Sequence, residues 1–160
     1  MTMRWSDFES GQDRDAVTVN VTSMPELEAE LRACFAAKKG FCLATLNLDH
    51  VYKLRHLPAF AEAYRQHSHV TADGNPIVWI SRLAGDNVSL LPGSDLVRPV
   101  SRIATECNAA LAFLGSSQAA LAGAKDALCA EIIRLPLVTH ESRRSKSTKK
   151  HHRSAVLTVI

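Results

Sequence analysis

The chain has 160 residues, of which 46% are hydrophobic and 22% are charged. These proportions lie near the globular average and exclude collagen-like, low-complexity and wholly disordered chains. By size we expect one domain, and such a chain buries about 68–70% of its unfolded surface without needing disulfides or metals. No apolar run approaches the roughly 18–20 residues that span a bilayer, and residues 1–7 lack the apolar region of a secretory signal. We therefore expect a cytoplasmic protein.

Basic charge is concentrated at the C-terminal end of the chain. The net charge is +3, yet residues 139–160 hold six Lys or Arg against one acid, which leaves 13 basic and 15 acidic side chains on the first 138 residues. Apart from Glu141 and Thr148, residues 141–153 are Ser, Lys, Arg and His with no periodicity, and we expect 137–160 to be a disordered basic tail. Such a tail could attract phosphates, but it lacks interleaved aromatic residues. A solvated tail is favoured, and no nucleic-acid partner is expected.

Strands and helices alternate along the chain after a polar lead-in over residues 1–15. The patterns predict strands over 16–21, 41–46, 69–72 and 109–114, and helices over 24–39, 51–57, 58–64, 77–84, 96–107 and 117–133. Ser23 and Glu26 have the spacing of a capping box at the first helix, and Ser94 is a candidate cap of the fifth. This order predicts an α/β fold, a Rossmann-like parallel sheet with flanking helices. The alternation stops after the last helix, so we expect the sheet to be incomplete at the C-terminus.

Cysteine and histidine residues show no strong metal-binding or catalytic spacing. The four cysteines have apolar or Ala-rich neighbours, so we interpret them as reduced, buried thiols (Cys34, Cys42, Cys107 and Cys129). His67 and His69 could ligate a metal from one strand face, but no acidic or cysteine cluster joins them. Ordinary surface or core histidines are favoured.

Three loops follow predicted strands at the edge where open parallel sheets bind ligands: 45–47, 73–76 and 115–117. Asp73 would place a carboxylate there, although spacing alone favours a simple cap of the next helix. Thr45 and Asn47 offer a hydroxyl and an amide, or else form a turn with local hydrogen bonds. The Gly-Ser-Ser loop could present amides to a phosphate, but it lacks a fuller glycine-rich pattern.

Four motifs together resemble a known family. They are Thr-Leu-Asn-Leu-Asp-His at 45–50, Ala-Asp-Gly-Asn-Pro-Ile-Val-Trp at 72–79, Gly-Ser-Asp-Leu at 93–96 and Phe-Leu-Gly at 113–115. Their order and spacing over residues 16–135 resemble the WecG/TagA/CpsF glycosyltransferase family. The resemblance implies a bacterial α/β enzyme of surface polysaccharide synthesis. Such an enzyme moves an amino sugar of the N-acetylmannosamine type from a UDP-sugar donor to a polyprenyl-diphosphate-linked acceptor. No cofactor or metal is implied.

The resemblance also implies roles for individual residues. Asp73 matches the acidic residue taken as the family's general base, in an inverting displacement, and Thr45 is grouped with it as catalytic. The residues expected to bind substrate or support the pocket are Asn47, Gly74, Asn75, Gly93, Ser94, Asp95 and Gly115.

The sequence departs from the family pattern after residue 136. Family members continue with a further strand, a Gly-x-Pro-Lys-Gln-Glu-like segment and a membrane-associated appendage, none of which the sequence shows. We therefore interpret 16–136 as the N-terminal part of the family domain in a truncated or frameshifted chain, with weak or no activity alone. Peripheral association with the inner face of the plasma membrane is expected from the lipid-linked acceptor. The alternative is a non-catalytic remnant or interaction module that needs a partner to complete its sheet, since open sheet edges favour homo-oligomers.

Overall fold

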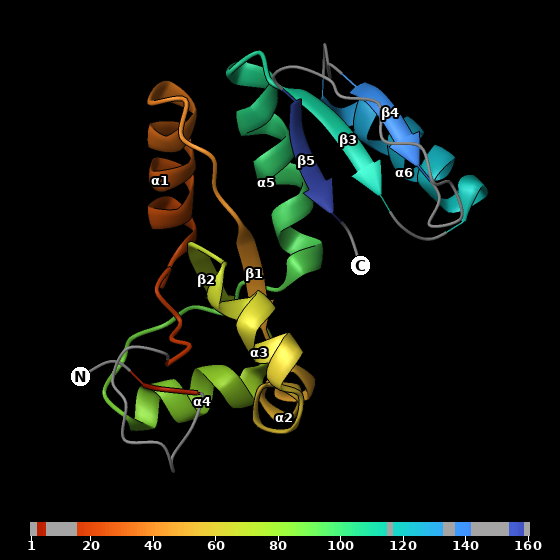
Figure 1. Cartoon of the computed structure of the whole chain (residues 1–160). Helices are drawn as coiled ribbons and strands as arrows, with labels where there is room; N and C mark the ends of the chain where they lie inside the picture. Colours follow the sequence, from red (N-terminus) through yellow and green to blue (C-terminus); the bar gives the residue numbers. More distant parts are fainter. Residues whose placement is uncertain (1–2, 6–15, 115–116, 133–136, 142–153, 159–160) are drawn as a thin grey trace. The chain divides into compact units, whose positions relative to one another are not determined.

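A computed structural model describes residues 3–5, 16–114, 117–132, 137–141 and 154–158. In chain order its elements are α1 (Met24–Ala36), β1 (Leu43–Leu46), α2 (Leu48–His56), α3 (Pro58–Arg65), β2 (His69–Ala72), α4 (Asn75–Leu83), α5 (Gly93–Glu106), β3 (Ala110–Leu114), α6 (Gln118–Glu131), β4 (Leu137–Glu141) and β5 (Ser154–Thr158) (Figure 1). They fall into two compact units, Met1–Leu96 and Val97–Ile160.

The first unit contains a parallel pair of strands joined by two helices. β1 and β2 pair in register from Leu43 opposite His69 to Leu46 opposite Ala72, so both strands end at the same edge. Apolar side chains from the strands and from α2, α3 and α4 form one core cluster with the N-terminal segment (Trp5, Val17, Val19, Leu46, Val51, Leu54, Ala61, Tyr64, Val70, Ala72, Ile77, Val78 and Val88). The predicted strands at 41–46 and 69–72 are confirmed, as is the break between α2 and α3 at Pro58.

The predicted strand over 16–21 is wrong, although its alternating pattern has a structural cause. Val17, Val19 and Val21 are buried, while Asn20 between them is exposed. Within the described residues the segment makes a single isolated bridge, between Thr18 and Arg4. The backbone N–H groups of Asn20 and Val21 both donate to the carbonyl of Val70. The alternating apolar pattern therefore reflects alternating burial along an extended segment. Among the described residues, this segment pairs with no strand over more than one bridge.

The first helix is capped by a variant of the predicted box. Ser23 Oγ accepts a hydrogen bond from the N–H of Glu26 at 3.4 Å. The Glu26 carboxylate instead accepts from the N–H of Thr22 (2.7 Å) and from its hydroxyl (2.8 Å). These bonds stabilise the ionised form and lower the pKa of Glu26; the backbone bond from Thr22 has the largest effect, followed by the hydroxyl bond.

The second unit is built around a parallel sheet in which β3 lies between β4 and β5. Phe113 of β3 packs with Leu121 and Leu128 of α6, and Arg98 pairs with Glu131 at 2.8 Å. The sequence predicts a disordered tail over 137–160, whereas the structure describes β4 and β5 within it. The physical reason is that both segments contain apolar residues that can pair with β3. The expected disorder over 142–153 lies outside the described residues.

The chain is therefore a mixed helix and strand fold with parallel strand pairing, as predicted. A single Rossmann-like sheet is not confirmed, because β1–β2 and β4–β3–β5 are separate sheets. Among the described residues, no helix combines the length and apolarity needed to cross a bilayer.

Candidate active site

The carboxyl ends of β1 and β2 bring Thr45 and Asp73 together. Thr45 is the third residue of β1, and Asp73 directly follows β2. The Thr45 hydroxyl donates to Asp73 Oδ2 at 3.0 Å, and both residues are half-buried. The backbone N–H of Asp73 also donates to the carbonyl of Leu46 at 2.8 Å. The two residues predicted to be catalytic are thus in direct contact.

Asp73 is not the cap of α4, contrary to what its spacing alone favours. Gly74 occupies the N-cap position, and no side chain makes a capping hydrogen bond there. Gly74 has φ +95° and ψ 140°, a backbone conformation that residues with a Cβ atom rarely adopt. The glycine lets the chain turn sharply from β2 into α4, and the Asp73 carboxylate is left directed at Thr45.

Asn47 makes the local hydrogen bond that its position after β1 suggests. It is the N-cap of α2, and its Oδ1 accepts from the N–H of His50 at 2.9 Å. The His50 ring returns to the strand end, with Nδ1 2.9 Å from the carbonyl oxygen of Thr45. His50 ends the motif at 45–50, but its sequence position alone indicates no catalytic role for it. The sequence signal for this contact is a histidine three residues after Asn47, the candidate helix cap, since its ring N–H can donate a hydrogen bond to the nearby strand end.

The loop that begins α5 comes close to Thr45. A Cβ added to Gly93 would lie 3.6 Å from both Oγ1 and Cγ2 of Thr45, so this glycine leaves the hydroxyl side open. The predicted cap at Ser94 is wrong, because α5 already begins at Gly93. Ser94 and Asp95 are exposed, and the Ser94 hydroxyl donates to the Asp95 carboxylate at 3.1 Å.

Of the two remaining predicted residues, Asn75 and Gly115, the structure describes Asn75, and it shows no hydrogen bond between this residue and Thr45 or Asp73. Asn75 is the exposed first residue of α4, and Gly115 lies outside the described residues. Ser117, from the same loop as Gly115, caps α6 by accepting from the N–H of Ala120 at 3.3 Å.

Tyr64 of α3 is buried close to this strand-end pair. Burial raises the pKa of its phenol, and the negative charge of Asp73 raises it further. Tyr64 Oη lies 3.5 Å from His50 Nδ1, and the two rings meet edge to face with centroids 5.6 Å apart. The phenol therefore stays neutral and can serve only as a hydrogen-bonding group.

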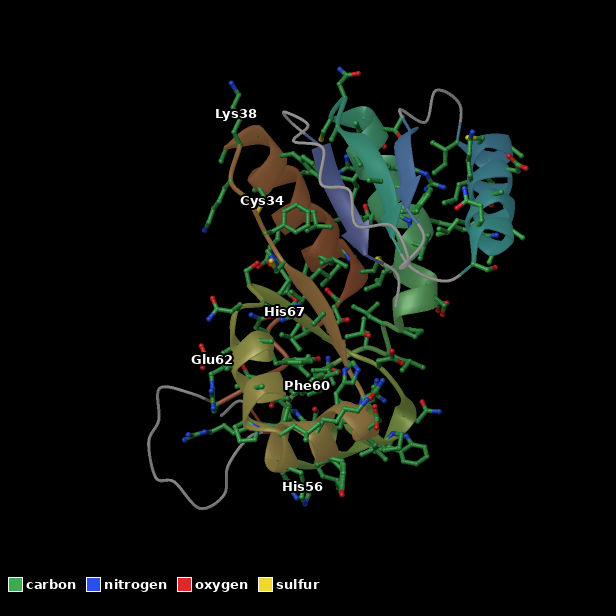
Figure 2. The ribbon with its side chains drawn as sticks, turned by 45° about the vertical axis from the view of Figure 1, so that its right-hand side comes forward. Cys34, Lys38, His56, Phe60, Glu62 and His67 are labelled. Carbon is green, nitrogen blue, oxygen red and sulfur yellow. The ribbon has the colours of Figure 1, made fainter. Side chains whose placement is uncertain are left out.

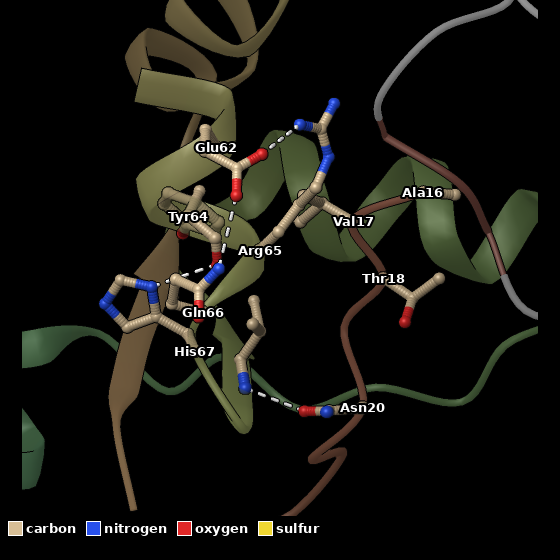
Figure 3. A pocket seen from close by; sticks show the side chains of 10 residues that line it. Ala16, Val17, Thr18, Asn20, Glu62, Tyr64, Arg65, Gln66 and His67 are labelled. Carbon is tan, nitrogen blue, oxygen red and sulfur yellow. Dashed lines mark hydrogen bonds and ion pairs between the residues drawn. The ribbon is translucent and has the colours of Figure 1, made fainter. Parts of the chain in front are cut away.

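A pocket of about 410 Å³ lies between the extended N-terminal segment and the α3–β2 connection (Figure 3). Its lining residues are Ala16, Val17, Thr18, Asn20, Glu62, Tyr64, Arg65, Gln66, His67 and Val70. The Glu62 carboxylate already accepts bonds from Arg65 and Gln66. Neither Thr45 nor Asp73 lines this pocket, so we place the candidate active site at the strand ends instead.

His67 and His69 make local contacts, whereas the cysteines are less buried than predicted. His67 Nδ1 lies 3.0 Å from the Tyr64 carbonyl, and His69 Nε2 lies 3.1 Å from a Glu30 carboxylate oxygen. No group of metal-ligating side chains occurs among the described residues. The prediction of buried thiols is wrong, because Cys34 is half-buried and the other three cysteines are exposed (Cys42, Cys107 and Cys129). The prediction failed because apolar and Ala-rich neighbours in the sequence occur beside exposed positions as well as beside buried ones.

Comparison with protein families gives a match to the glycosyl transferase WecG/TagA/CpsF family over residues 15–159. The chain belongs to this family. Comparisons with curated proteins and with solved structures find no match. The family match continues past residue 135, where the motif resemblance ends. Membership makes the chain a glycosyltransferase family protein and suggests a role in cell-surface polysaccharide synthesis, with a sugar donor and an acceptor as its substrates.

Proposed function

We propose that this family member transfers an amino sugar of the N-acetylmannosamine type from a UDP-sugar to a sugar acceptor linked to a polyprenyl diphosphate. One observation carries the proposal beyond family membership: the hydrogen bond of 3.0 Å between Thr45 Oγ1 and Asp73 Oδ2 at the shared end of two parallel strands. Ligands of open parallel sheets bind at this edge. A half-buried carboxylate held there by one hydroxyl keeps its other oxygen for a substrate.

In the proposed reaction, Asp73 acts as the general base. Its carboxylate takes the proton of the acceptor hydroxyl while that oxygen attacks the anomeric carbon of the donor sugar. The bond from this carbon to the UDP oxygen breaks, and UDP leaves with the bonding electron pair. Attack opposite the leaving group inverts the configuration. Base catalysis of this kind contributes on the order of 10²–10⁴-fold when the base is well placed.

Three helices begin around Thr45 and Asp73, which suits a diphosphate leaving group. Asn47 caps α2, Gly74 caps α4, and Gly93 opens α5 beside the Thr45 side chain. Helix N-termini carry partial positive charge and unpaired N–H groups that favour anions. Gly74, Gly93 and the neighbouring residues Asn75, Ser94 and Asp95 are accordingly proposed to bind the substrates, with Asn47 holding the end of β1.

The test is release of UDP from UDP-N-acetylmannosamine in the presence of an amino-sugar acceptor carried on a lipid diphosphate. We expect Asp73→Asn to lower kcat by roughly 10²–10⁴-fold, since the amide cannot take a proton. Asp126→Asn, an exposed carboxylate on α6, is the matched control and should leave kcat unchanged. NMR of the product should show the inverted anomer.

Two results would count against this assignment. Turnover that survives Asp73→Asn would remove the general-base role, and a retained anomeric configuration would exclude the single displacement. If the wild-type chain neither binds UDP nor turns over, the non-catalytic alternative becomes the better interpretation.

A lipid-linked acceptor requires the enzyme to meet a membrane surface, and α4 offers a suitable face. Its inner side buries Ile77 and Val78, while Trp79 and Leu83 are 59% and 88% exposed on the outer side. The exposed apolar side of such a helix is stable only against a second apolar surface. Exposed Trp and Leu are typical of helices that lie in the membrane interface. We expect Leu83→Glu to weaken co-sedimentation with anionic lipid vesicles. Ala124→Glu adds the same charge at an exposed position of α6 and should leave co-sedimentation unchanged.

A further inference from the structure

The geometry assigns His50 as a positioning residue whose ring holds the Thr45 strand end in place for the proposed transfer. The inference rests on the proposed function, because it concerns the same strand-end site. His50 contacts two of the predicted site residues at once: its backbone N–H donates to Asn47 Oδ1 at 2.9 Å, and its ring Nδ1 lies 2.9 Å from the carbonyl oxygen of Thr45.

The contact with Thr45 requires a proton on Nδ1 of the ring. A carbonyl oxygen can only accept a hydrogen bond, so Nδ1 must carry the proton and donate it. Both the neutral Nδ1–H tautomer and the imidazolium can make this bond. His50 therefore holds Thr45 without needing to gain or lose a proton.

Aromatic neighbours keep the His50 ring in this orientation. It meets Phe60 with centroids 5.5 Å apart and Tyr64 with centroids 5.6 Å apart. Figure 2 shows Phe60 on the inner side of α3, toward the strands. Tyr64 is 5% exposed, so it restricts movement of the imidazole from one side. The ring is thus held in one orientation before any substrate arrives.

Through Thr45, this arrangement acts on the catalytic carboxylate. His50 fixes the Thr45 carbonyl, and the Thr45 hydroxyl donates to Asp73 Oδ2 at 3.0 Å. A shift of the strand end would change the direction in which the Asp73 carboxylate points. Small misplacements of catalytic groups are costly to rate because the reacting atoms must be closely aligned.

The test compares two substitutions at this position. His50→Phe keeps the aromatic packing but removes the ring N–H, and should lower kcat about tenfold, the size expected for one lost hydrogen bond, with KM for the donor nearly unchanged. His50→Asn places an amide N–H near the position of Nδ1 and should recover most of the wild-type kcat. Its pH profile should keep the wild-type shape, because His50 exchanges no proton in this role.

His56 provides the matched control on the same helix. Its Nδ1 lies 2.7 Å from the Tyr52 carbonyl, so it makes the same kind of bond, but it is exposed and points outward from α2 (Figure 2). His56→Phe should leave kcat unchanged. Thermal unfolding midpoints of all variants identify any general loss of stability.

A separate measurement keeps this inference distinct from the proposed function. Nitrogen-15 NMR of the substrate-free chain should show the Nδ1–H tautomer at His50, whether or not the chain turns over a UDP-sugar. An Nε2–H tautomer, wild-type kcat in His50→Phe, or equal losses in His50→Phe and His50→Asn would each overturn the positioning role. Loss of one limb of the pH profile in His50→Asn would also overturn it, since the ring would then exchange a proton itself.

Discussion

At the scale of single residues, the candidate site is a short chain of hydrogen bonds that crosses two strand ends. His50 bonds to the Thr45 carbonyl, the Thr45 hydroxyl bonds to Asp73, and the Asp73 N–H bonds to Leu46. Each contact joins residues that are close in sequence to a strand end but 5 to 28 positions apart from one another along the chain. The arrangement leaves Asp73 half-buried and free of any capping role.

The Thr45 hydroxyl can be tested apart from the Asp73 carboxylate. Thr45→Val keeps the shape of the side chain but removes the donor to Asp73 Oδ2, and we expect kcat/KM for sugar transfer to fall about tenfold. Thr45→Ser keeps the hydroxyl and should stay within about threefold of the wild type. Steady-state UDP release measures both. Equal rates for Val and Ser would mean that the hydroxyl does not orient the carboxylate.

At the scale of elements, two helix starts decide how the site is supported. α4 begins directly after Asp73 through a glycine with positive φ, and α1 begins with a carboxylate that bonds back to the preceding residue. The start of α4 sets the direction of the proposed catalytic carboxylate, and the start of α1 contributes to the stability of the fold.

The glycine at the start of α4 should not tolerate a side chain. Gly74→Ala forces a Cβ atom onto a backbone with φ +95°, and we expect a loss of about 1–3 kcal/mol in the free energy of unfolding. Gly40→Ala is the control, because a Cβ there meets nothing within 4 Å and its φ is not positive. Urea unfolding of both variants measures the difference. A Gly74→Ala chain as stable as Gly40→Ala would show that the turn relaxes freely.

The start of α1 predicts a pH dependence of stability. The pKa of Glu26 is lowered in the folded chain from a reference value of 4.5, so the ionised carboxylate contributes stability that is fully present above that value. This contribution is lost as the pH falls through the lower, folded-state pKa. Glu26→Gln cannot ionise, so its stability deficit relative to the wild type should be present at pH 7 and shrink in strongly acidic solution. Urea midpoints across this range test the sign, and a deficit independent of pH would contradict it.

At the scale of the whole molecule, the family match spans residues 15–159 while the strands form two separate sheets. A single Rossmann-like sheet stays a prediction from the strand and helix order. The domain limits at residues 16 and 136 and the disorder expected over 142–153 also stay predictions, and the roles of the individual site residues are proposals.

Hydrogen exchange can decide whether β1 belongs to a larger sheet. In a two-stranded sheet, alternate amides of Leu43–Leu46 lack a strand partner and should exchange rapidly, whereas a strand on each side protects all four. Because β2 is the strand that pairs with β1 among the described residues, we expect alternate amides to exchange rapidly, and protection of all four would show a second strand partner. Light scattering on the same sample separates an intramolecular partner from a second copy of the chain. Rapid exchange of alternate amides in a monomer would rule out the continuous sheet.

Local sequence patterns predicted most of the elements. The apolar run at 41–46, the short strand at 69–72 and the proline break at residue 58 all occur where expected. These features depend on backbone preference and on side-chain periodicity within a few residues, which can be read from the sequence directly. The strand over 16–21 was wrong because alternation indicates burial but does not reveal whether a neighbouring strand is present.

The sequence by itself determined the family motifs, the alternation of helices and strands, and the residue types at the strand ends. Only the tertiary structure decided that Asp73 bonds to Thr45 and does not cap α4, and that His50 closes the same network. Spacing along the chain cannot tell these two roles of Asp73 apart. A carboxylate before a helix can accept from the first N–H groups of that helix or from a side chain on a neighbouring strand. The register of β1 against β2 and the backbone at Gly74 determine which partner it contacts.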